Sequence, residues 1–77
     1  MIQDHIKEIA LDLLGEPNKK LSTDKELRFG TYGSMSVDLE KGTFFSHEDN
    51  EGGGTIDLVK RYVSDHVDYL KKYEEPK

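Results

Sequence analysis

Cysteine is absent from this 77-residue chain. Its absence excludes a disulfide framework, a thiolate zinc site and a cysteine nucleophile. Long apolar runs are also missing, since the longest covers residues 9–11, so we expect no membrane span and no membrane contact. The first residues lack the basic and apolar regions that open a signal peptide. A small domain without disulfides is typical of the cytoplasm, where we expect this chain to act.

Net positive charge is lacking as well. Eleven Lys and Arg stand against sixteen Asp and Glu, which gives a formal charge of −5 at pH 7. A generally cationic nucleic-acid-binding or membrane-binding protein is therefore disfavoured, and any such contact requires a local patch. Hydrophobic residues make up only 34% of the chain, so its core will be thin, yet the aromatic and aliphatic residues argue against disorder.

Apolar residues at helical spacing occur near both ends of the chain. Ile2, Ile6, Ile9 and Leu13 predict a first helix, which ends at Gly15. A second stripe is formed by Ile56, Val59, Val63, then Val67 or His66, and Leu70. Thr55 is predicted to be the N-cap of this region, which is one long helix or two short ones divided at residues 64–65. The charged stretch 71–77 is expected to fray.

The middle of the chain alternates between apolar and polar residues, as β-strands do. Three short strands are predicted, at residues 26–29, 34–39 and 43–46, joined as an antiparallel meander. Gly42 is predicted to have a positive φ in a tight hairpin turn, and residues 47–54 are predicted to be a polar loop. The prediction is therefore one α+β domain, residues 1–77, with an N-terminal helix, a three-stranded antiparallel meander and a C-terminal helix or helix pair packed on the sheet.

The loop 47–54 contains residue types that bind metals. Counted from Asp49 as the first position, the sequence fits an EF-hand calcium loop in part. However, the fifth position is Gly53, which has no oxygen-bearing side chain, and the twelfth is Lys60, where a bidentate Glu is required. A loose Mg or Mn site is the second possibility, and a solvated acidic loop is the simplest interpretation. We therefore predict no metal and no cofactor. The residues that would hold the weak Mg or Mn site are His47, Glu48, Asp49 and Glu51.

The glycine run 52–54 leads into the predicted second helical region. Glycines before a helix can present backbone N–H groups to a phosphate, but the P-loop and dinucleotide-binding spacings are both absent. The simpler interpretation is a sharp turn from sheet to helix. No nucleophile elbow with an ordered His partner can be traced, and a domain this small hardly encloses a dry cleft. We predict that the chain is not an enzyme on its own.

Several cations occur near aromatic residues in the predicted sheet. Rings that stack on bases, beside Lys or Arg that meet phosphates, form the usual platform for single-stranded nucleic acid. Phe44 and Phe45 must point to opposite faces of a strand, so at least one of them belongs to the core. The candidate nucleic-acid-binding residues are Arg28, Phe29, Lys41, Phe44, Phe45, Lys60 and Arg61.

Two stretches, residues 34–46 and 52–59, resemble the zinc-ribbon domain of bacterial and phage DNA primases and primase-helicases. In that family a strand, a Glu-Lys-Gly hairpin and an aromatic strand lead to a cysteine-containing knuckle, and a glycine-rich segment then opens a helix. Here the hairpin is 40–42 and the glycine-rich segment is 52–54, and the match runs without a gap over residues 34–59.

The resemblance does not extend to the zinc ligands. The family's second cysteine pair falls here on Ser46 and Asp49, and the first would lie near residues 30–33, where no ligand type occurs. The resemblance therefore implies a zinc-free form, in which packed helices replace the folding free energy of a structural zinc.

The function implied by this resemblance is that of a non-catalytic accessory domain. It would belong to a phage or mobile-element primase or primase-helicase and contact single-stranded DNA template during replication. Its protein partner would be a catalytic primase or helicase domain, or another replication protein. The alternative is an acidic protein–protein interaction module in a replication or host-takeover complex, which the net charge favours.

Overall fold

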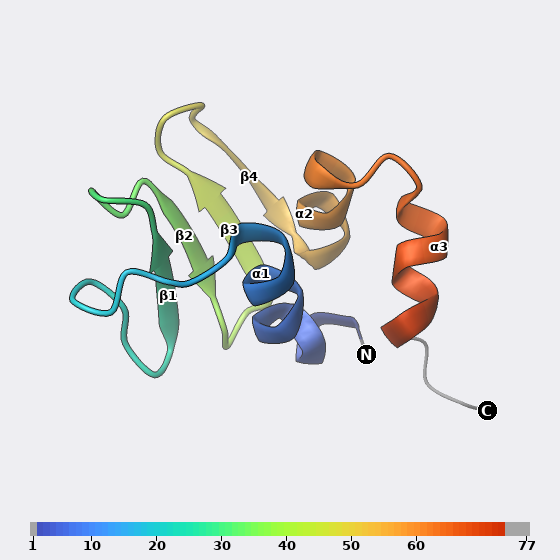
Figure 1. Ribbon diagram of the computed structural model, residues 1–77, viewed down its shortest axis with the longest axis horizontal. Coiled ribbons are helices and arrows are strands. Elements are labelled where there is room, and N and C mark those ends of the chain that lie inside the picture. The colour runs from blue at the N-terminus through green and yellow to red at the C-terminus, as the bar shows by residue number, and fades with distance from the viewer. Residues whose placement is uncertain (1, 74–77) are drawn as a thin grey trace.

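The computed structural model describes residues 2–73, which form an α+β fold with an N-terminal helix, an antiparallel sheet and C-terminal helices, as predicted (Figure 1). Two short 3₁₀ helices, η1 and η2, flank the regular elements. No helix within residues 2–73 is long and apolar enough to span a membrane. The elements in chain order are η1 (Ile2–His5), α1 (Ile6–Leu14), β1 (Glu26–Phe29), β2 (Met35–Asp38), β3 (Thr43–Ser46), β4 (Glu51–Gly54), α2 (Thr55–Tyr62), α3 (His66–Leu70) and η2 (Lys71–Tyr73).

The sheet has four strands in the order β1-β2-β3-β4, so the prediction of three strands is wrong (Figure 1). The segment predicted to be the end of a polar loop is β4, which pairs antiparallel with β3. Three of its four residues are glycine. Glycine contributes no alternation of apolar and polar side chains, so the pattern that reveals the other strands is missing from this one.

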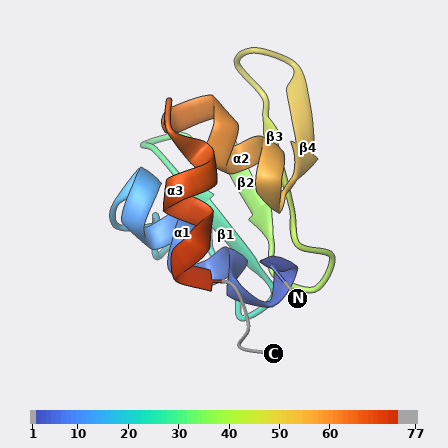
Figure 2. The same ribbon diagram turned by 90° about the vertical axis from the view of Figure 1, so that its right-hand side faces the viewer.

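The hydrophobic core lies on one face of the sheet. Alternate residues of β1, β2 and β3 point to this face, and α1 and α2 pack against it (Figure 2). Burial of each large aliphatic side chain contributes about 1.5–3 kcal/mol to the free energy of folding. The buried apolar residues are Ile6, Ile9 and Ala10 from α1, Leu27, Phe29, Met35, Val37 and Phe44 from the sheet, and Leu58 and Val59 from α2.

The second helical region consists of two helices, which is one of the two predicted alternatives. Residues 63–65 separate them, and the Asp65 carboxylate accepts a backbone N–H in the first turn of α3 at 3.3 Å. The predicted apolar stripe is partly wrong, because Ile56 and Val67 are 44% and 61% exposed while Leu58 is fully buried. Ile56 and Leu58 both lie in α2, so the predicted stripe missed the buried side of that helix, and the break at residues 63–65 changes the direction in which Val67 of α3 points.

The β2–β3 turn has the conformation that the sequence predicts. Gly42 has a φ of +69°, in the left-handed region that glycine adopts without steric cost. The Asp38 carboxylate accepts the backbone N–H groups of Glu40 and Lys41, each at 2.9 Å. These bonds replace the ladder bonds that the chain loses where it reverses.

Thr55 is the first residue of α2 and not its N-cap, which is Gly54. Its buried hydroxyl donates a hydrogen bond of 2.8 Å to the carbonyl oxygen of Gly42, so it ties the start of α2 to the β2–β3 turn. The capping role falls to Asp57, whose carboxylate accepts the N–H of Gly54 at 3.2 Å. Of the stretch expected to fray, residues 71–73 form η2 and residues 74–77 lie outside the described range.

Candidate nucleic-acid interface

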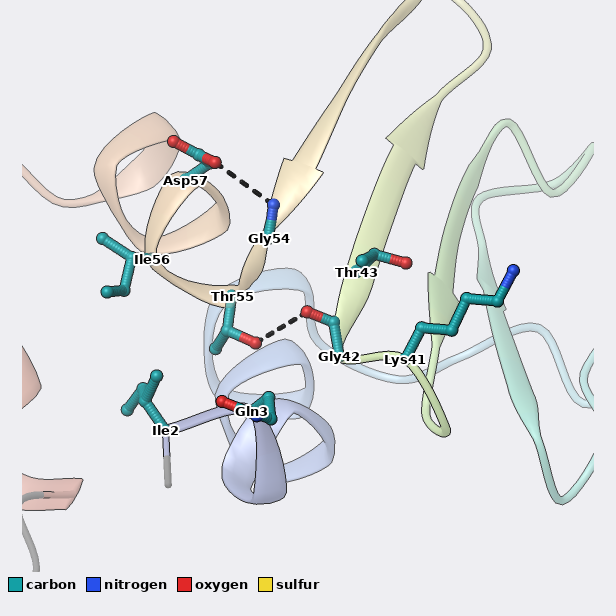
Figure 3. Close-up of a pocket in the computed structure, with 9 residues that line it drawn as sticks. All are labelled: Ile2, Gln3, Lys41, Gly42, Thr43, Gly54, Thr55, Ile56 and Asp57. Atoms are coloured by element: carbon teal, nitrogen blue, oxygen red, sulfur yellow. Dashed lines mark hydrogen bonds between the residues drawn. The ribbon is translucent and has the colours of Figure 1, made fainter.

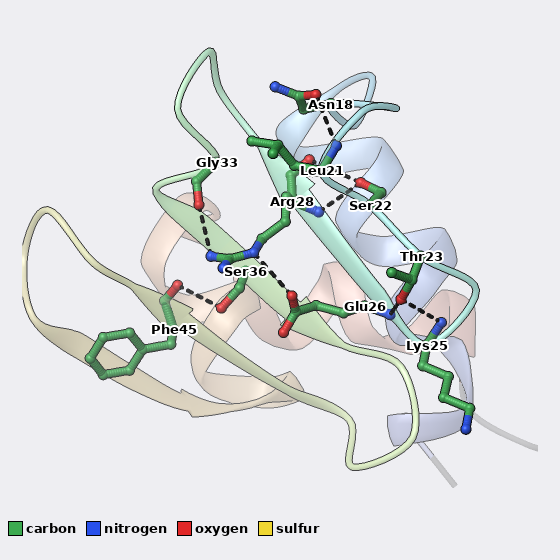
Figure 4. Close-up of polar contacts among 10 residues, drawn as sticks. All are labelled: Asn18, Leu21, Ser22, Thr23, Lys25, Glu26, Arg28, Gly33, Ser36 and Phe45. Atoms are coloured by element: carbon green, nitrogen blue, oxygen red, sulfur yellow. Dashed lines mark hydrogen bonds and ion pairs between the residues drawn. The ribbon is translucent and has the colours of Figure 1, made fainter.

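The second face of the sheet is not covered by any helix within residues 2–73 (Figures 2 and 4). Strand pairing places Arg28 opposite Ser36, Ser36 opposite Phe45, and Phe45 opposite Gly52. These four residues, one from each strand, form a line across the sheet that we call the open-face row. Its three side chains are half-buried, so each combines a fixed position with access from solvent.

Phe45 is the aromatic member of the open-face row. It is the outward-pointing residue of the phenylalanine pair, since Phe44 is buried. Its ring lies against Gly52, where an added Cβ would come within 2.7 Å of the ring. The ring of His47 lies edge-on to it with 4.9 Å between centroids. The glycine therefore provides the space that the ring occupies on the sheet.

Arg28 is the cationic member of the row (Figure 4). Its Nε atom lies 3.0 Å from a carboxylate oxygen of Glu26, and its Nη1 atom donates to the carbonyl oxygen of Gly33 at 2.9 Å. These two contacts hold the guanidinium on the open face. A partly exposed ion pair of this kind contributes only about 0–1 kcal/mol, so an incoming phosphate can compete with Glu26 at small cost.

The strand that carries Arg28 is held in place by the connector between α1 and β1. Asn18 donates its N–H to the Arg28 carbonyl at 2.6 Å, and the Ser22 hydroxyl accepts the Arg28 N–H at 2.9 Å. Thr23 donates its N–H to the Glu26 carbonyl at 2.7 Å. The connector thus closes the outer edge of β1, which protects that edge from pairing with another chain (Figure 4).

The structure brings together only part of the predicted set of nucleic-acid contacts. Phe29 and Phe44 are 5% and 7% exposed and belong to the core, so neither ring can stack on a base, which corrects that part of the prediction. Lys41 is exposed in the β2–β3 turn, and Lys60 is exposed on α2. Arg28 and Phe45 are the two predicted residues that share the open-face row.

Arg61 is engaged with carboxylates and does not form a free basic patch. It makes an ion pair with Asp49, and its Nη1 atom lies 3.1 Å from a carboxylate oxygen of Glu51. Its guanidinium also lies over the ring of Tyr62, 5.8 Å from the centroid. Arg61 therefore connects α2 to the β3–β4 turn, and its charge is largely compensated by these two acidic residues.

Residues 2–73 contain no group of three His, Asp or Glu side chains arranged to hold a metal ion. The two positions at which the resemblance would place a pair of zinc ligands are Ser46 and Asp49. They are joined by a hydrogen bond of 3.2 Å, which the Ser46 hydroxyl donates to the Asp49 carboxylate. In this turn a hydrogen bond and the ion pair with Arg61 provide the local cross-links.

A pocket of about 410 Å³ lies at the N-terminal end of α2 (Figure 3). Ile2 and Ile56 form an apolar wall of this pocket, and Lys41 lines the pocket on the side of the β2–β3 turn. The phosphate site considered for the glycine run would lie here. However, the Asp57 carboxylate already accepts the Gly54 N–H and adds a negative charge, which disfavours a second anion.

The role of Gly52 beneath Phe45 is the feature that sequence reasoning missed. The available signal was the run of three glycines, because glycine inside a strand often marks a place where another group approaches closely. The strand itself had to be recognised before that signal had a meaning. In comparisons with protein-family models, curated proteins and solved structures, nothing matches this chain.

Proposed function

We propose that this chain is a zinc-free, non-catalytic accessory domain of a phage or mobile-element DNA primase or primase-helicase. In this proposal it acts in the cytoplasm and contacts single-stranded DNA template beside a catalytic primase or helicase domain. The observation that carries the proposal is the open-face row, in which Arg28 and Phe45 lie on one uncovered sheet face. The motifs of residues 34–59 give the proposal its replication context.

The row offers the two contacts that single-stranded DNA needs. A base stacks on the ring of Phe45, which contributes about 1–3 kcal/mol. A phosphate meets the guanidinium of Arg28, two strands away and so about 10 Å across the sheet. Because the phosphate must compete with Glu26 and the chain carries a charge of −5, binding is weak and strongly salt-dependent.

The contribution of Phe45 is tested with a labelled oligothymidine whose fluorescence anisotropy is measured at low and at moderate salt. Phe45→Leu keeps an apolar side chain over Gly52 but removes the stacking ring, so Kd should rise by about 5- to 150-fold. Phe45→Tyr should retain the parent affinity. Tyr32→Ala is the matched control, because Tyr32 is 92% exposed, is aromatic and lies outside the row. Equal affinities for the parent and Phe45→Leu would contradict the proposal.

The contribution of Arg28 is tested by the salt dependence of the same titration. Arg28→Gln should reduce the slope of log K against log salt by about 0.7, the value for one phosphate contact with a single strand. Glu26→Gln should increase affinity, since it removes the carboxylate that competes for the guanidinium. A slope that is unchanged by Arg28→Gln would remove this residue from the interface.

The acidic β3–β4 turn favours a second candidate function, a protein–protein interaction module in a replication or host-takeover complex. Glu48, Asp49 and Glu51 lie in or beside this turn, and Arg61 pairs with Asp49 and Glu51 and so compensates part of this charge. Such a module would show no oligonucleotide binding at low salt. The anisotropy titration therefore separates the two candidates.

A further inference from the structure

The two outer edges of the sheet differ in how their backbone groups are satisfied. In β1, the N–H and C=O groups of Glu26 and Arg28 point away from β2. All four are bonded to the connector, through Asn18, Ser22 and Thr23. The outer edge of β1 is therefore closed.

The register shows which groups of β4 point outward. His47 donates its N–H to the Ser34 carbonyl at 2.7 Å, so the backbone groups of Phe45, two residues earlier, also face β2. Phe44 and Ser46 consequently face β4, and they form the hydrogen-bonded pairs with Gly53 and Glu51. The N–H and C=O groups of Gly52, which lies between those two residues, must point away from the sheet.

These outward groups of Gly52 have no hydrogen-bond partner among residues 2–73. Gly54 also points outward, but its N–H is accepted by the Asp57 carboxylate. Within residues 2–73, no hydrogen bond is made to the outward N–H or C=O of Gly52, which is exposed. Natural proteins usually cover or charge such edges, because unpaired groups with no side chain to shield them accept another strand.

We propose that the outer edge of β4 accepts an extended, basic segment of a partner protein as a fifth strand, through backbone hydrogen bonds at Gly52. The backbone groups of this edge differ from the side chains of Arg28 and Phe45 that contact DNA in the proposed function, so protection of Gly52 by a peptide and binding of an oligonucleotide are measured as separate outcomes. The partner chain can approach closely because the edge has no side chain at positions 52–54.

Charge selects the class of partner. Glu48 and Asp49 precede β4, Glu51 is its first residue and Asp57 follows it in α2, while Arg61 is paired with Asp49 and Glu51. A second copy of the chain would bring its own acidic turn against this one, and like charges facing each other across strands are destabilising. A segment with Lys or Arg side chains instead gains from every one of these carboxylates.

The open face adds a further preference. A partner residue opposite Gly52 itself projects onto the open face, where the ring of Phe45 lies against Gly52, because paired residues on neighbouring strands point to the same face. A Lys or Arg side chain there can lie over the ring as a cation–π contact. The occupant that fits is thus an extended segment with alternating basic residues.

The test uses the full ¹⁵N-labelled chain and two short capped peptides, one of alternating Lys and Val and one of alternating Glu and Val. Amide hydrogen exchange is followed for Gly52, and Gly53 is the internal control because its backbone already pairs with Phe44. With the basic peptide, exchange at Gly52 should slow by at least about fivefold, the effect of one new hydrogen bond, and Gly53 should not change. The acidic peptide should have no effect.

Charge variants complete the test. Glu51→Gln should weaken binding of the basic peptide, and Glu16→Gln, in the connector after α1, should not. No protection of Gly52 by the basic peptide would overturn the proposal, as would equal protection by both peptides. Protection that appears without peptide and grows with protein concentration would identify a second copy as the occupant and also overturn it.

Discussion

Gly42 is the position at which a single added methyl group tests the packing between three segments of the chain. Its φ of +69° makes alanine unfavourable by about 1 kcal/mol. An added Cβ would also overlap the Cβ of Gln3 in η1 and lie 3.3 Å from the hydroxyl of Thr55. Displacing η1 to make room for the methyl group costs a further 1–2 kcal/mol, roughly, in the free energy of unfolding, as in other overpacked sites. Gly42→Ala should therefore lower the free energy of unfolding by about 2–3 kcal/mol.

Gly30→Ala is the matched control. Gly30 has a similar φ of +88°, but an added Cβ there would meet the hydroxyl of Ser34 at 3.7 Å, which is an ordinary contact distance. The loss of stability in Gly30→Ala should be limited to the conformational contribution, about 1 kcal/mol. Both variants and the parent are compared by urea unfolding, followed by circular dichroism, with the same slope m required for all three.

Asparagine separates the two contributions further, because it tolerates a positive φ better than alanine does. Gly42→Asn should stay destabilised, since its Cβ meets Gln3 as well. Equal losses for the two alanine variants, or full recovery in Gly42→Asn, would refute the packing of η1 against this turn.

Three other substitutions have defined consequences. Thr55→Val leaves the buried carbonyl of Gly42 without its donor, so the free energy of unfolding should fall by about 1–3 kcal/mol in urea titrations. Burial and the 2.6 Å hydrogen bond to Asp12 raise the pKa of Tyr69 above its ordinary value, so the folded state favours the neutral phenol. The stabilisation from Tyr69 is present below the unfolded-state pKa of about 10 and is lost as the pH rises through the folded-state pKa. Between pH 8 and about 11, the free energy of unfolding should therefore fall more in the parent than in Tyr69→Phe. Arg61→Met should speed amide exchange throughout the β3–β4 turn with little change in melting temperature, because partly exposed ion pairs contribute only about 0–1 kcal/mol.

Most of the fold could be predicted because it depends on local patterns. Alternation in β1, β2 and β3 reveals which residues face the core, and the spacing from Ile6 to Ala10 reveals the buried side of α1. Gly42 was predictable because a tight hairpin turn between two alternating strands needs a positive φ. These features require information from only a few neighbouring residues.

The remaining features depend on contacts between distant parts of the chain. β4 is a strand because β3 supplies its hydrogen bonds, and its glycines carry no pattern of their own. Thr55 looks like an N-cap locally, but the Gly42 carbonyl makes it a buried donor. Arg61 was predicted to contact nucleic acid, but in the folded chain Asp49 and Glu51 lie beside its guanidinium and pair with it. In the candidate site, Arg28 and Phe45 could be predicted from the sequence as contacts, but the register of β1, β2 and β3 was needed to show that they share a row.

The most direct test of the central claim is chemical-shift mapping of the full chain with a short oligothymidine at low salt. We expect shifts of backbone and side-chain resonances along the open-face row, at Arg28, Ser36, Phe45 and Gly52, that diminish as salt is added. Resonances of the buried face, such as those of Val37, should move little. Absence of shifts at low salt, or shifts confined to α2 and α3, would contradict a DNA-binding role for the open sheet face.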